Sequence, residues 1–440
     1  MRQSFRAAPG GRLSGSLRVP GDKSISHRAI MLGAIADGVT RVSGFLEGAD
    51  ALSTMNAFRA LGVTIEGPAA GRVVVHGVGL HGLRQAAGPL DCGNAGTAMR
   101  LMMGLLAGQR FESTLIGDES LSKRPMRRVA DPLALMGARI ETRDGRPPVR
   151  ILPCDRLKGI RYEMPMASAQ VKSALLLAGL YAEGETTVIE PAPTRDHTER
   201  MLGGFGVRVV RDGAAASLVG GRPLRATAID VPADISSAAF FLVGAAISPD
   251  SDLRLEHVGM NPTRTGVIDI LRLMGADIAV ENPREVGGEP VADLRVRGGA
   301  LRGIAVPREL VPLAIDEFPA LFVAAACAEG RTVVTGAEEL RVKESDRIAV
   351  MADGLRALGV SAEPTPDGIV IEGRGGDARV FGGGEIATHH DHRIAMSFAI
   401  AALRAGGTIS IRDTDVVATS FPGFVALARG AGLDIEETRG

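Results

Sequence analysis

Six stretches of the chain combine a helix-start signal with a run of small apolar residues. They begin at Asp22, Gly93, Met166, Ala233, Ile315 and His390. Each has Asp, Ser or Asn near its start, where a side-chain oxygen can accept hydrogen bonds from the unpaired N–H groups of the first turn. Because Ala, Leu, Met and Ile then occupy nearly all positions, the pattern predicts six buried helices.

A short β-type run and a second, more amphipathic helix follow each of these stretches. The second helices end near glycines suited to a left-handed conformation, namely Gly62, Gly137, Gly206, Gly275, Gly359 and Gly432. Alternating segments come next and turn at Gly, Asp or Pro, as in residues 63–77 and 360–373. The pattern therefore indicates a unit of about seventy residues, roughly βαβαββ, that occurs six times.

The sixth unit ends early, after the first strand of its final hairpin. Residues 5–20 resemble the tails of other units, such as residues 218–232 and 294–307. We therefore expect the N-terminal segment to complete the last unit. The predicted fold is α/β with two domains of three units each. Their expected boundaries are residues 21–232 for the first domain, and residues 1–20 plus 233–440 for the second.

Composition narrows the class of protein. The 440 residues are 45% hydrophobic and 23% charged, which is enough apolar material for two cores of about 200 residues. No apolar run approaches the roughly 20 residues that span a bilayer, so we expect no membrane partner. A net charge of -1 and the absence of Trp argue against nucleic-acid binding. Three scattered cysteines fit a reducing cytoplasm, and the basic N-terminal start lacks the apolar core of a signal peptide.

Cations gather at the predicted helix starts of the first half and in one loop. They are Lys23, Arg28, Arg100, Lys123, Arg124, Arg127, Arg128 and Lys172, with Arg195 later in the third unit. If the helix starts converge on one cleft, each contributes ~0.3–1 kcal/mol toward a bound anion at the surface. A cation at ~4 Å is nominally ~4 kcal/mol before desolvation, so side chains dominate. Each cation taken alone is equally a solvated surface charge.

The second half adds carboxylates beside cations, a combination that can be tuned for proton transfer. Asp316 and Glu317 open one buried helix, and residues 341–347 and 389–393 carry further charged groups. Alternatives are a helix cap for Asp316, a charged helix face for residues 341–347, and a metal site at residues 389–392. Alternation would send His390 and His392 to one face and their neighbours to the other, so we expect no metal.

Two phosphate-binding patterns are poorly supported. Residues 77–82 match G-x-G-x-x-G, but no clear helix follows them, which argues against a dinucleotide site. The chain also lacks the GxxxxGK[ST] loop of P-loop kinases and ATPases. An anion site would therefore have to be built from the helix starts.

Six motifs, in this order, resemble the 5-enolpyruvylshikimate-3-phosphate (EPSP) synthases. They are GDKSISHR, GNAGTAMR, KRPM, PMASAQVKSALLLAGL, RVKESDR and DHRIAMS, and two of them resemble the second bacterial class of that family. The resemblance spans essentially the whole chain. It implies transfer of the enolpyruvyl group of phosphoenolpyruvate to the 5-hydroxyl of shikimate 3-phosphate, with release of phosphate. It also implies an inside-out α/β barrel arrangement, no metal or organic cofactor, and a monomer.

The resemblance assigns roles to individual residues. Shikimate 3-phosphate would contact Lys23, Ser24, Arg28, Ser168, Ala169, Gln170, Arg195, Asp316 and Lys343. Phosphoenolpyruvate would contact Lys23, Asn94, Gly96, Arg124, Gln170, Arg347 and Arg393. Asp316 would take the proton from the attacking hydroxyl, and Glu344 would deliver or remove the methylene proton. Lys23 would assist the leaving phosphate or protonation.

Some positions depart from the first class of the family. Ala169 and Thr419 stand where that class has a serine and a lysine, so we leave Thr419 out of the site. Gly96 matches the pattern usually sensitive to glyphosate.

Two other functions remain open at this point. The related transferase acting on UDP-N-acetylglucosamine has Lys-Asn in place of Lys23-Ser24 and usually a reactive cysteine near residues 123–126, where this chain has none. A catalytically silent anion-binding protein would need neither Asp316 nor Glu344.

Overall fold

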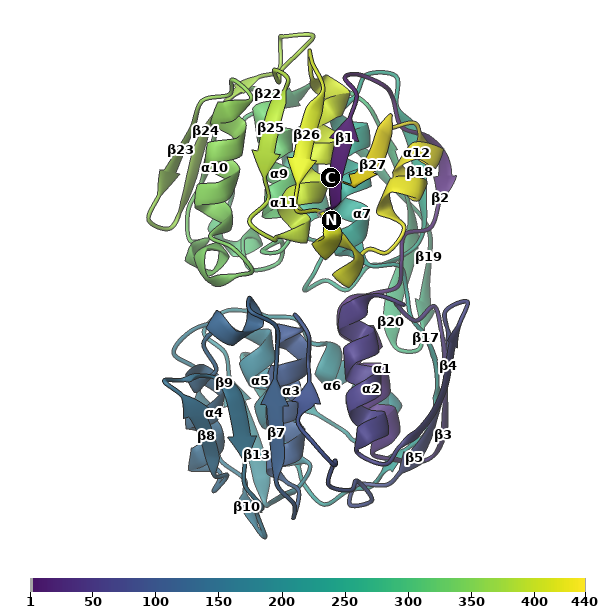
Figure 1. The fold of residues 1–440 in the computed structure, drawn as a ribbon, viewed down its shortest axis with the longest axis vertical. Helices are drawn as coiled ribbons and strands as arrows, with labels where there is room; N and C mark the ends of the chain where they lie inside the picture. Colours follow the sequence, from purple (N-terminus) through teal and green to yellow (C-terminus); the bar gives the residue numbers. More distant parts are fainter. Residues whose placement is uncertain (1–2, 440) are drawn as a thin grey trace. The chain divides into compact units, whose positions relative to one another are not determined.

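The computed structural model describes residues 3–439 as a mixed α/β protein that divides into two compact units (Figure 1). Unit 1 comprises Met1–Pro20, Pro232–Glu285 and Pro290–Gly440, and unit 2 comprises Gly21–Val231 and Val286–Glu289. Each unit has its own hydrophobic core, built from the small apolar residues of its helices and the inward-facing residues of its sheets. No helix within residues 3–439 combines the length and apolar character needed to cross a bilayer.

Unit 2 contains three mixed sheets, a two-stranded parallel sheet formed by β10 and β12, and their helices. Its helices are α1 (Lys23–Ala34), α2 (Ala49–Ala60), α3 (Gly96–Ala107), η1 (Leu121–Lys123), α4 (Arg127–Leu135), α5 (Ala169–Gly179) and α6 (His197–Gly204). Its strands are β3 (Ala36–Ser43), β4 (Thr64–Ala69), β5 (Arg72–Val78), β6 (Leu90–Asp91), β7 (Ser113–Ile116), β8 (Ile140–Arg143), β9 (Arg146–Ile151), β10 (Leu157–Lys158), β11 (Arg161–Glu163), β12 (Ala182–Glu183), β13 (Glu185–Ile189), β14 (Val210–Asp212), β15 (Ala215–Val219), β16 (Leu224–Arg225) and β17 (Ala228–Asp230).

Unit 1 has a similar set of elements. Its helices are α7 (Ile235–Ile247), α8 (Gly266–Leu273), η2 (Arg308–Leu310), α9 (Phe318–Ala326), η3 (Glu338–Val342), α10 (Arg347–Ala357), α11 (His392–Ala401), η4 (Ala402–Arg404), η5 (Asp415–Thr419) and α12 (Phe424–Ala431). Its strands are β1 (Gln3–Ala7), β2 (Ser14–Leu17), β18 (Asp252–Gly259), β19 (Asp277–Val286), β20 (Glu289–Arg297), β21 (Leu301–Arg302), β22 (Ala328–Val334), β23 (Ala362–Thr365), β24 (Gly368–Arg374), β25 (Gly384–Ala387), β26 (Ile409–Arg412) and β27 (Ile435–Arg439).

The main sheets share one strand pattern, an antiparallel set with a parallel strand added at one edge. In unit 2 the orders are β16-β3-β5-β4, β6-β7-β9-β8 and β11-β13-β15-β14. In unit 1 they are β2-β18-β20-β19, β21-β22-β24-β23 and β25-β26-β1-β27. The N-terminal strand β1 lies antiparallel between β26 and β27, and Phe5 is paired with Ile411 on one side and Glu437 on the other.

The predicted buried helices are confirmed as α1, α3, α5, α7, α9 and α11. Nearly all their residues are buried, because side chains on every side of each helix are small or apolar. The six predicted terminator glycines are also confirmed, with φ between +84° and +116°. The apolar pattern therefore predicts where the buried helices lie, and the glycines predict where the second helices end.

The predicted side-chain caps are wrong at two of these helices. Asp22, Ser168, Asp234 and Asp391 cap α1, α5, α7 and α11 by accepting a backbone N–H bond. The N-caps of α3 and α9, Ala95 and Glu317, make no such bond. The polar groups near those two starts are engaged by other side chains: Asn94 bonds Arg124, and Glu317 bonds Ser236. Long-range contacts have displaced the local cap.

Candidate active site

In unit 2, the Arg28 guanidinium donates hydrogen bonds to uncharged oxygens. The guanidinium donates from Nε to Thr198 Oγ1 at 2.7 Å, from Nη2 to Ser173 Oγ at 2.9 Å, and from Nη1 to the Ser24 carbonyl at 2.9 Å. Burial lowers the pKa of Arg28 to about 10, the charges of Glu199 and Asp22 oppose this shift, and the positive charge of Arg195 adds to it. A buried cation beside a second cation is a site that an anion would stabilise.

Lys23 lies at the start of α1 and is held by Asp50 of α2. Its Nζ is 3.0 Å from Asp50 Oδ2, and the carboxylate is almost fully buried. One turn along α1, His27 bonds Thr54 Oγ1 through Nδ1 at 2.7 Å. Burial lowers the pKa of His27 to about 3, and the charges of Lys23 and Arg28 contribute to the same shift. The positive charges of Lys23 and Arg28 thus act on the first turns of α1, where Asp22 and Asp50 supply negative charge.

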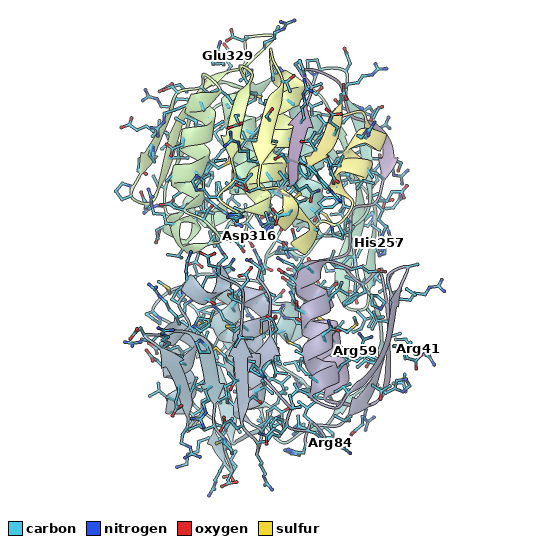
Figure 2. All side chains as sticks on the ribbon, in the orientation of Figure 1. Arg41, Arg59, Arg84, His257, Asp316 and Glu329 are labelled. Carbon is cyan, nitrogen blue, oxygen red and sulfur yellow. The ribbon has the colours of Figure 1, made fainter. Side chains whose placement is uncertain are left out.

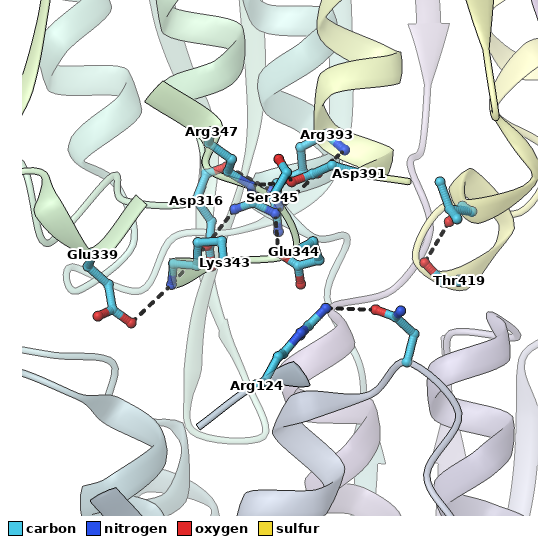
Figure 3. A network of polar contacts seen from close by, with 12 residues as sticks. Arg124, Asp316, Glu339, Lys343, Glu344, Ser345, Arg347, Asp391, Arg393 and Thr419 are labelled. Atoms are coloured by element: carbon cyan, nitrogen blue, oxygen red, sulfur yellow. Dashed lines mark hydrogen bonds and ion pairs between the residues drawn. The ribbon is translucent and has the colours of Figure 1, made fainter. Parts of the chain in front are cut away.

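Asn94, Gly96 and Arg124 meet at the start of α3. Arg124 donates from Nη2 to Asn94 Oδ1 at 2.9 Å (Figure 3). Asn94 donates from Nδ2 to Asp118 Oδ2 at 2.8 Å. A Cβ added at Gly96 would lie 2.9 Å from Arg124 Nη1 and 3.2 Å from Arg100 Nη1. Glycine is therefore required for the guanidinium groups to approach the helix start this closely.

Helix α5 contributes Ser168, Ala169 and Gln170 to the same unit. Gln170 accepts from Arg100 Nη1 at 2.5 Å and donates to Thr97 Oγ1 at 2.9 Å, which ties α5 to α3. Ser168 caps α5 and Ala169 is its first residue. Hydrogen bonds therefore link α1 to α5 and α6 through Arg28, and α3 to α5 through Gln170.

Unit 1 contains a second cluster, centred on Arg347 at the start of α10 (Figure 3). The side chain is 1% exposed and bonds three carboxylates. Its Nε lies 2.8 Å from Asp391 Oδ2, its Nη1 3.3 Å from Asp316 Oδ1, and its Nη2 2.5 Å from Glu344 Oε2. Burial lowers the pKa of Arg347, but the charges of Asp391, Glu344 and Asp316 outweigh burial and raise it.

Asp316 lies between two cations, just before α9. Its Oδ1 is 3.3 Å from Arg347 Nη1 and 3.4 Å from Lys343 Nζ, and Lys343 also approaches Glu339 at 3.7 Å. Arg393 donates from Nη1 to the Asp316 backbone carbonyl at 3.0 Å. A carboxylate held this way keeps a fixed position and can accept a proton from a substrate hydroxyl.

Residues 389–393 form a turn into α11, so the predicted alternation is wrong. His389 and His390 have φ of +51° and +58°, and Asp391 then caps α11 through the Arg393 N–H. Among residues 3–439 there is no group of three or more His, Cys, Asp or Glu that could hold a metal ion. Thr419, outside the predicted site, ends η5 and donates to the Val416 carbonyl at 2.6 Å.

Several residues that hold the clusters together were missing from the sequence prediction. Asp50, Thr198 and Ser173 bond Lys23 and Arg28, and Asp391 bonds Arg347. Two of them lay in quoted motifs, Asp391 in DHRIAMS and Ser173 in PMASAQVKSALLLAGL. Asp50 and Thr198 lay in no motif, and their importance depends on partners far along the chain.

Comparison with known proteins agrees with this geometry. A model of the family described as EPSP synthase (3-phosphoshikimate 1-carboxyvinyltransferase) matches residues 7–427. Proteins named 3-phosphoshikimate 1-carboxyvinyltransferase from Methylococcus capsulatus and Alkalilimnicola ehrlichii are each 68% identical; the matches cover 98% and 99% of this chain and 98% and 97% of the relatives. The EPSP synthase structure from Acinetobacter baumannii is 61% identical with a TM-score of 0.90, covering 99% of this chain and 100% of that one. A chain with this sequence and these two clusters belongs to the EPSP synthase family.

Proposed function

We propose that this chain transfers the enolpyruvyl group of phosphoenolpyruvate to the 5-hydroxyl of shikimate 3-phosphate and releases phosphate. Membership of the EPSP synthase family supports the reaction. The observation that carries the chemical assignment is the Asp316 carboxylate, held between Arg347 and Lys343 and beside Glu344. Binding alone would not require two carboxylates there.

We propose that the residues named by the motifs bind the two substrates. Arg28, Arg195, Ser24, Ser168, Ala169, Gln170 and Lys343 would bind shikimate 3-phosphate, with Lys23 and Asp316 in contact with it. Arg124, Arg347, Arg393, Asn94 and Gly96 would bind phosphoenolpyruvate, with Lys23 and Gln170 in contact with it. Arginine suits both tasks because its planar guanidinium grips carboxylate or phosphate through two parallel hydrogen bonds. Two polyanions repel each other, so cations must offset that repulsion while the reactants are aligned.

The proton balance assigns separate tasks to the two carboxylates. Asp316 takes the proton of the 5-hydroxyl as the hydroxyl oxygen bonds to C2 of phosphoenolpyruvate, while Glu344, protonated at the start of the cycle, delivers its proton to the C3 methylene. Asp316 then releases the hydroxyl proton to solvent, which balances the proton that the departing phosphate receives. The resulting tetrahedral intermediate loses phosphate when the bond between C2 and the phosphate ester oxygen breaks. Glu344 removes a methyl proton to restore the double bond. Lys23 donates a hydrogen bond or proton to the departing phosphate. These steps require only acid–base groups of the chain.

We further propose that each of the two compact units is a domain made of three βαβαββ repeats, in the inside-out α/β barrel arrangement. The domain boundaries would be residues 21–232, and residues 1–20 plus 233–440. The strand pairing supports this. Strands β6, β21 and β25 each follow one sheet along the chain and pair in parallel with the next sheet of the same unit. Strands β16 and β2 pair in parallel with β3 and β18, in the first sheet of each unit. We propose a monomer in the cytoplasm; Cys92 and Cys327 fit this as buried free thiols.

Replacement of Asp316 by Asn tests the assignment. We expect kcat for phosphate release to fall by at least ~100-fold, the scale of positioned acid–base catalysis, while shikimate 3-phosphate binding largely survives. Calorimetric titration measures binding and a phosphate assay measures turnover. Asp353→Asn on the exposed face of α10 is the matched control and should leave both unchanged.

Three outcomes would redirect the proposal. Equal losses of binding and turnover in Asp316→Asn would make Asp316 a structural residue. Turnover of the unaltered chain with UDP-N-acetylglucosamine, and none with shikimate 3-phosphate, would instead identify the related transferase. Binding without any phosphate release would identify a silent anion-binding protein.

A further inference from the structure

Lys172 is a fully buried lysine on α5 that the proposed reaction does not use. Its side chain is 0% exposed, and its Nζ lies 3.0 Å from Glu190 Oε2 and 2.9 Å from Glu199 Oε1. Arg211 completes the cluster, at 3.2 Å from Glu190 Oε1 and 2.9 Å from Glu199 Oε1. Two cations and two carboxylates thus balance in charge inside unit 2.

Such a cluster is a costly way to fill a core. Buried ion pairs lose much of their Coulomb energy to desolvation, and apolar side chains of similar volume often stabilise a protein equally well or better. The neighbours Val171, Ala174, Leu175 and Leu176 on α5 are all buried and apolar. The packing of α5 alone therefore does not account for a charged residue at position 172.

The cluster holds one loop, the segment between β13 and α6. Lys172 Nζ donates to the Thr194 carbonyl at 3.4 Å, and Thr194 Oγ1 donates to Glu190 Oε2 at 2.6 Å. Thr194 is bonded through both its backbone and its side chain, and the next residue is Arg195. Farther along, Thr198 Oγ1 donates to Ser173 Oγ at 2.8 Å. Helix α5 thus contacts the chain on both sides of Arg195, at Thr194 in the loop and at Thr198 in α6.

We propose that Lys172 is a positioning residue for Arg195, fixing the loop from which Arg195 reaches the phosphate of shikimate 3-phosphate. This inference rests on the proposed function, which makes Arg195 a substrate ligand. Lys172 itself touches no substrate, because its side chain is wholly enclosed. Its charge anchors the two glutamates and the Thr194 carbonyl, so that Arg195 meets its anion without first ordering the loop.

A double-mutant cycle between Lys172 and Arg195 tests the proposal. Arg195→Ala and Lys172→Met should each raise KM for shikimate 3-phosphate by about 10- to 100-fold, the scale of a misplaced binding group, and change KM for phosphoenolpyruvate much less. The double variant should be no worse than Arg195→Ala alone, because Lys172 acts through Arg195. Lys158→Met, an exposed lysine on β10, is the matched control.

Charge imbalance in Lys172→Met is addressed by a second variant. Lys172→Met with Glu190→Gln removes one cation and one carboxylate, leaving Glu199 paired with Arg211. It should fold, retain the raised KM and show the same lack of additivity with Arg195→Ala. Thermal unfolding of each variant monitors folding, and Lys172→Arg should recover part of the lost affinity.

The outcomes separate the two proposals. If Arg195→Ala leaves KM unchanged, Arg195 is not a ligand, and both its assigned role and the positioning inference are overturned. If Arg195→Ala raises KM but Lys172→Met does not, or their effects multiply, only the inference about Lys172 is overturned. Failure of both Lys172 variants to fold would make the cluster a stability element and would also overturn the inference.

Discussion

The two arginine-centred clusters solve opposite electrostatic problems. In unit 2, Arg28 is bonded to two hydroxyls and one carbonyl, and its pKa is lowered by burial. In unit 1, Arg347 is equally buried but bonded to three carboxylates, which raise its pKa. The first arginine keeps its charge available for an incoming anion, whereas the second has its charge neutralised within the protein.

This difference indicates a division of labour between the clusters. The desolvation free energy of a buried cation with neutral partners is offset only when a substrate anion binds. A cation surrounded by carboxylates instead holds those carboxylates in place, and Asp316 and Glu344 then keep defined positions for proton transfer. Substitutions at the two arginines should therefore separate stability from substrate affinity.

Replacing Arg347 by Met should have the largest effect. It leaves Asp316, Glu344 and Asp391 buried around a missing charge, and breaking a buried pair in this way costs about 3–5 kcal/mol of stability. We expect kcat to fall by ~10³-fold or more, because both an electrostatic contact and the carboxylate positions are lost. Urea unfolding and a phosphate-release assay measure the two effects.

Arg356→Met on the same helix is the control for Arg347→Met, since its side chain is about half exposed and pairs with Asp353. It should change neither stability nor kcat appreciably. An Arg347→Met protein as stable as the unaltered chain would contradict the view that this arginine neutralises the carboxylates.

Replacing Arg28 by Met should weaken binding without weakening the fold. Thr198 and Ser173 already bond each other at 2.8 Å, and Glu199, the carboxylate with the largest charge effect on Arg28, keeps Lys172 and Arg211 as ion-pair partners when the guanidinium is removed. We expect stability to change by less than about 1 kcal/mol, since an apolar replacement of a buried charge is often neutral. KM for shikimate 3-phosphate should rise by ~100-fold, the scale of a lost charged contact.

Steady-state kinetics and urea unfolding again measure both effects for Arg28→Met. Arg59→Met provides a matched control on α2 of the same unit, where the guanidinium bonds surface carbonyls. If Arg28→Met destabilised the protein as strongly as Arg347→Met does, the contrast between the clusters would be lost.

Local pattern predicts much of this fold. Runs of small apolar residues identified the six buried helices, and single glycines identified where the second helices end. These features depend on residues within one or two turns of each other. The cap prediction failed at α3 and α9 because Asn94 and Glu317 bond Arg124 and Ser236, residues that lie 30 and 81 positions away.

In the candidate site, too, the sequence names some residues but does not predict their distant partners. Motifs named the residues expected to touch substrate, and those assignments stay predictions. The contacts that hold these residues join distant segments: Arg28 and Thr198 are separated by 170 positions, and Arg347 and Asp391 by 44. No spacing rule within one element predicts such partners, so Asp50 and Thr198 acquire their interest only in the folded chain. Lys172 was among the cations expected near a bound anion, but the structure pairs it with Glu190 and Glu199.

The burial of His27 near Lys23 and Arg28 should also appear in the pH dependence of stability. Burial, with the charges of Lys23 and Arg28, lowers the pKa of His27 to about 3, whereas the unfolded chain takes up that proton near 6.5. As pH falls below 6.5 the unfolded state therefore binds more protons, and stability declines until pH approaches the folded pKa. His27→Gln removes this loss and can keep a bond to Thr54.

Urea unfolding at pH 7 and pH 5 measures this smallest effect. The unaltered chain should lose about 2 kcal/mol more than His27→Gln between these values, because one proton contributes ~1.4 kcal/mol per pH unit. His76→Gln, at a partly exposed position on β5, is the control for replacing a histidine by glutamine. Identical pH profiles for the unaltered chain and His27→Gln would mean that His27 accepts a proton in the folded state. The cations around α1 would then not create the anion-ready environment that distinguishes unit 2 from unit 1.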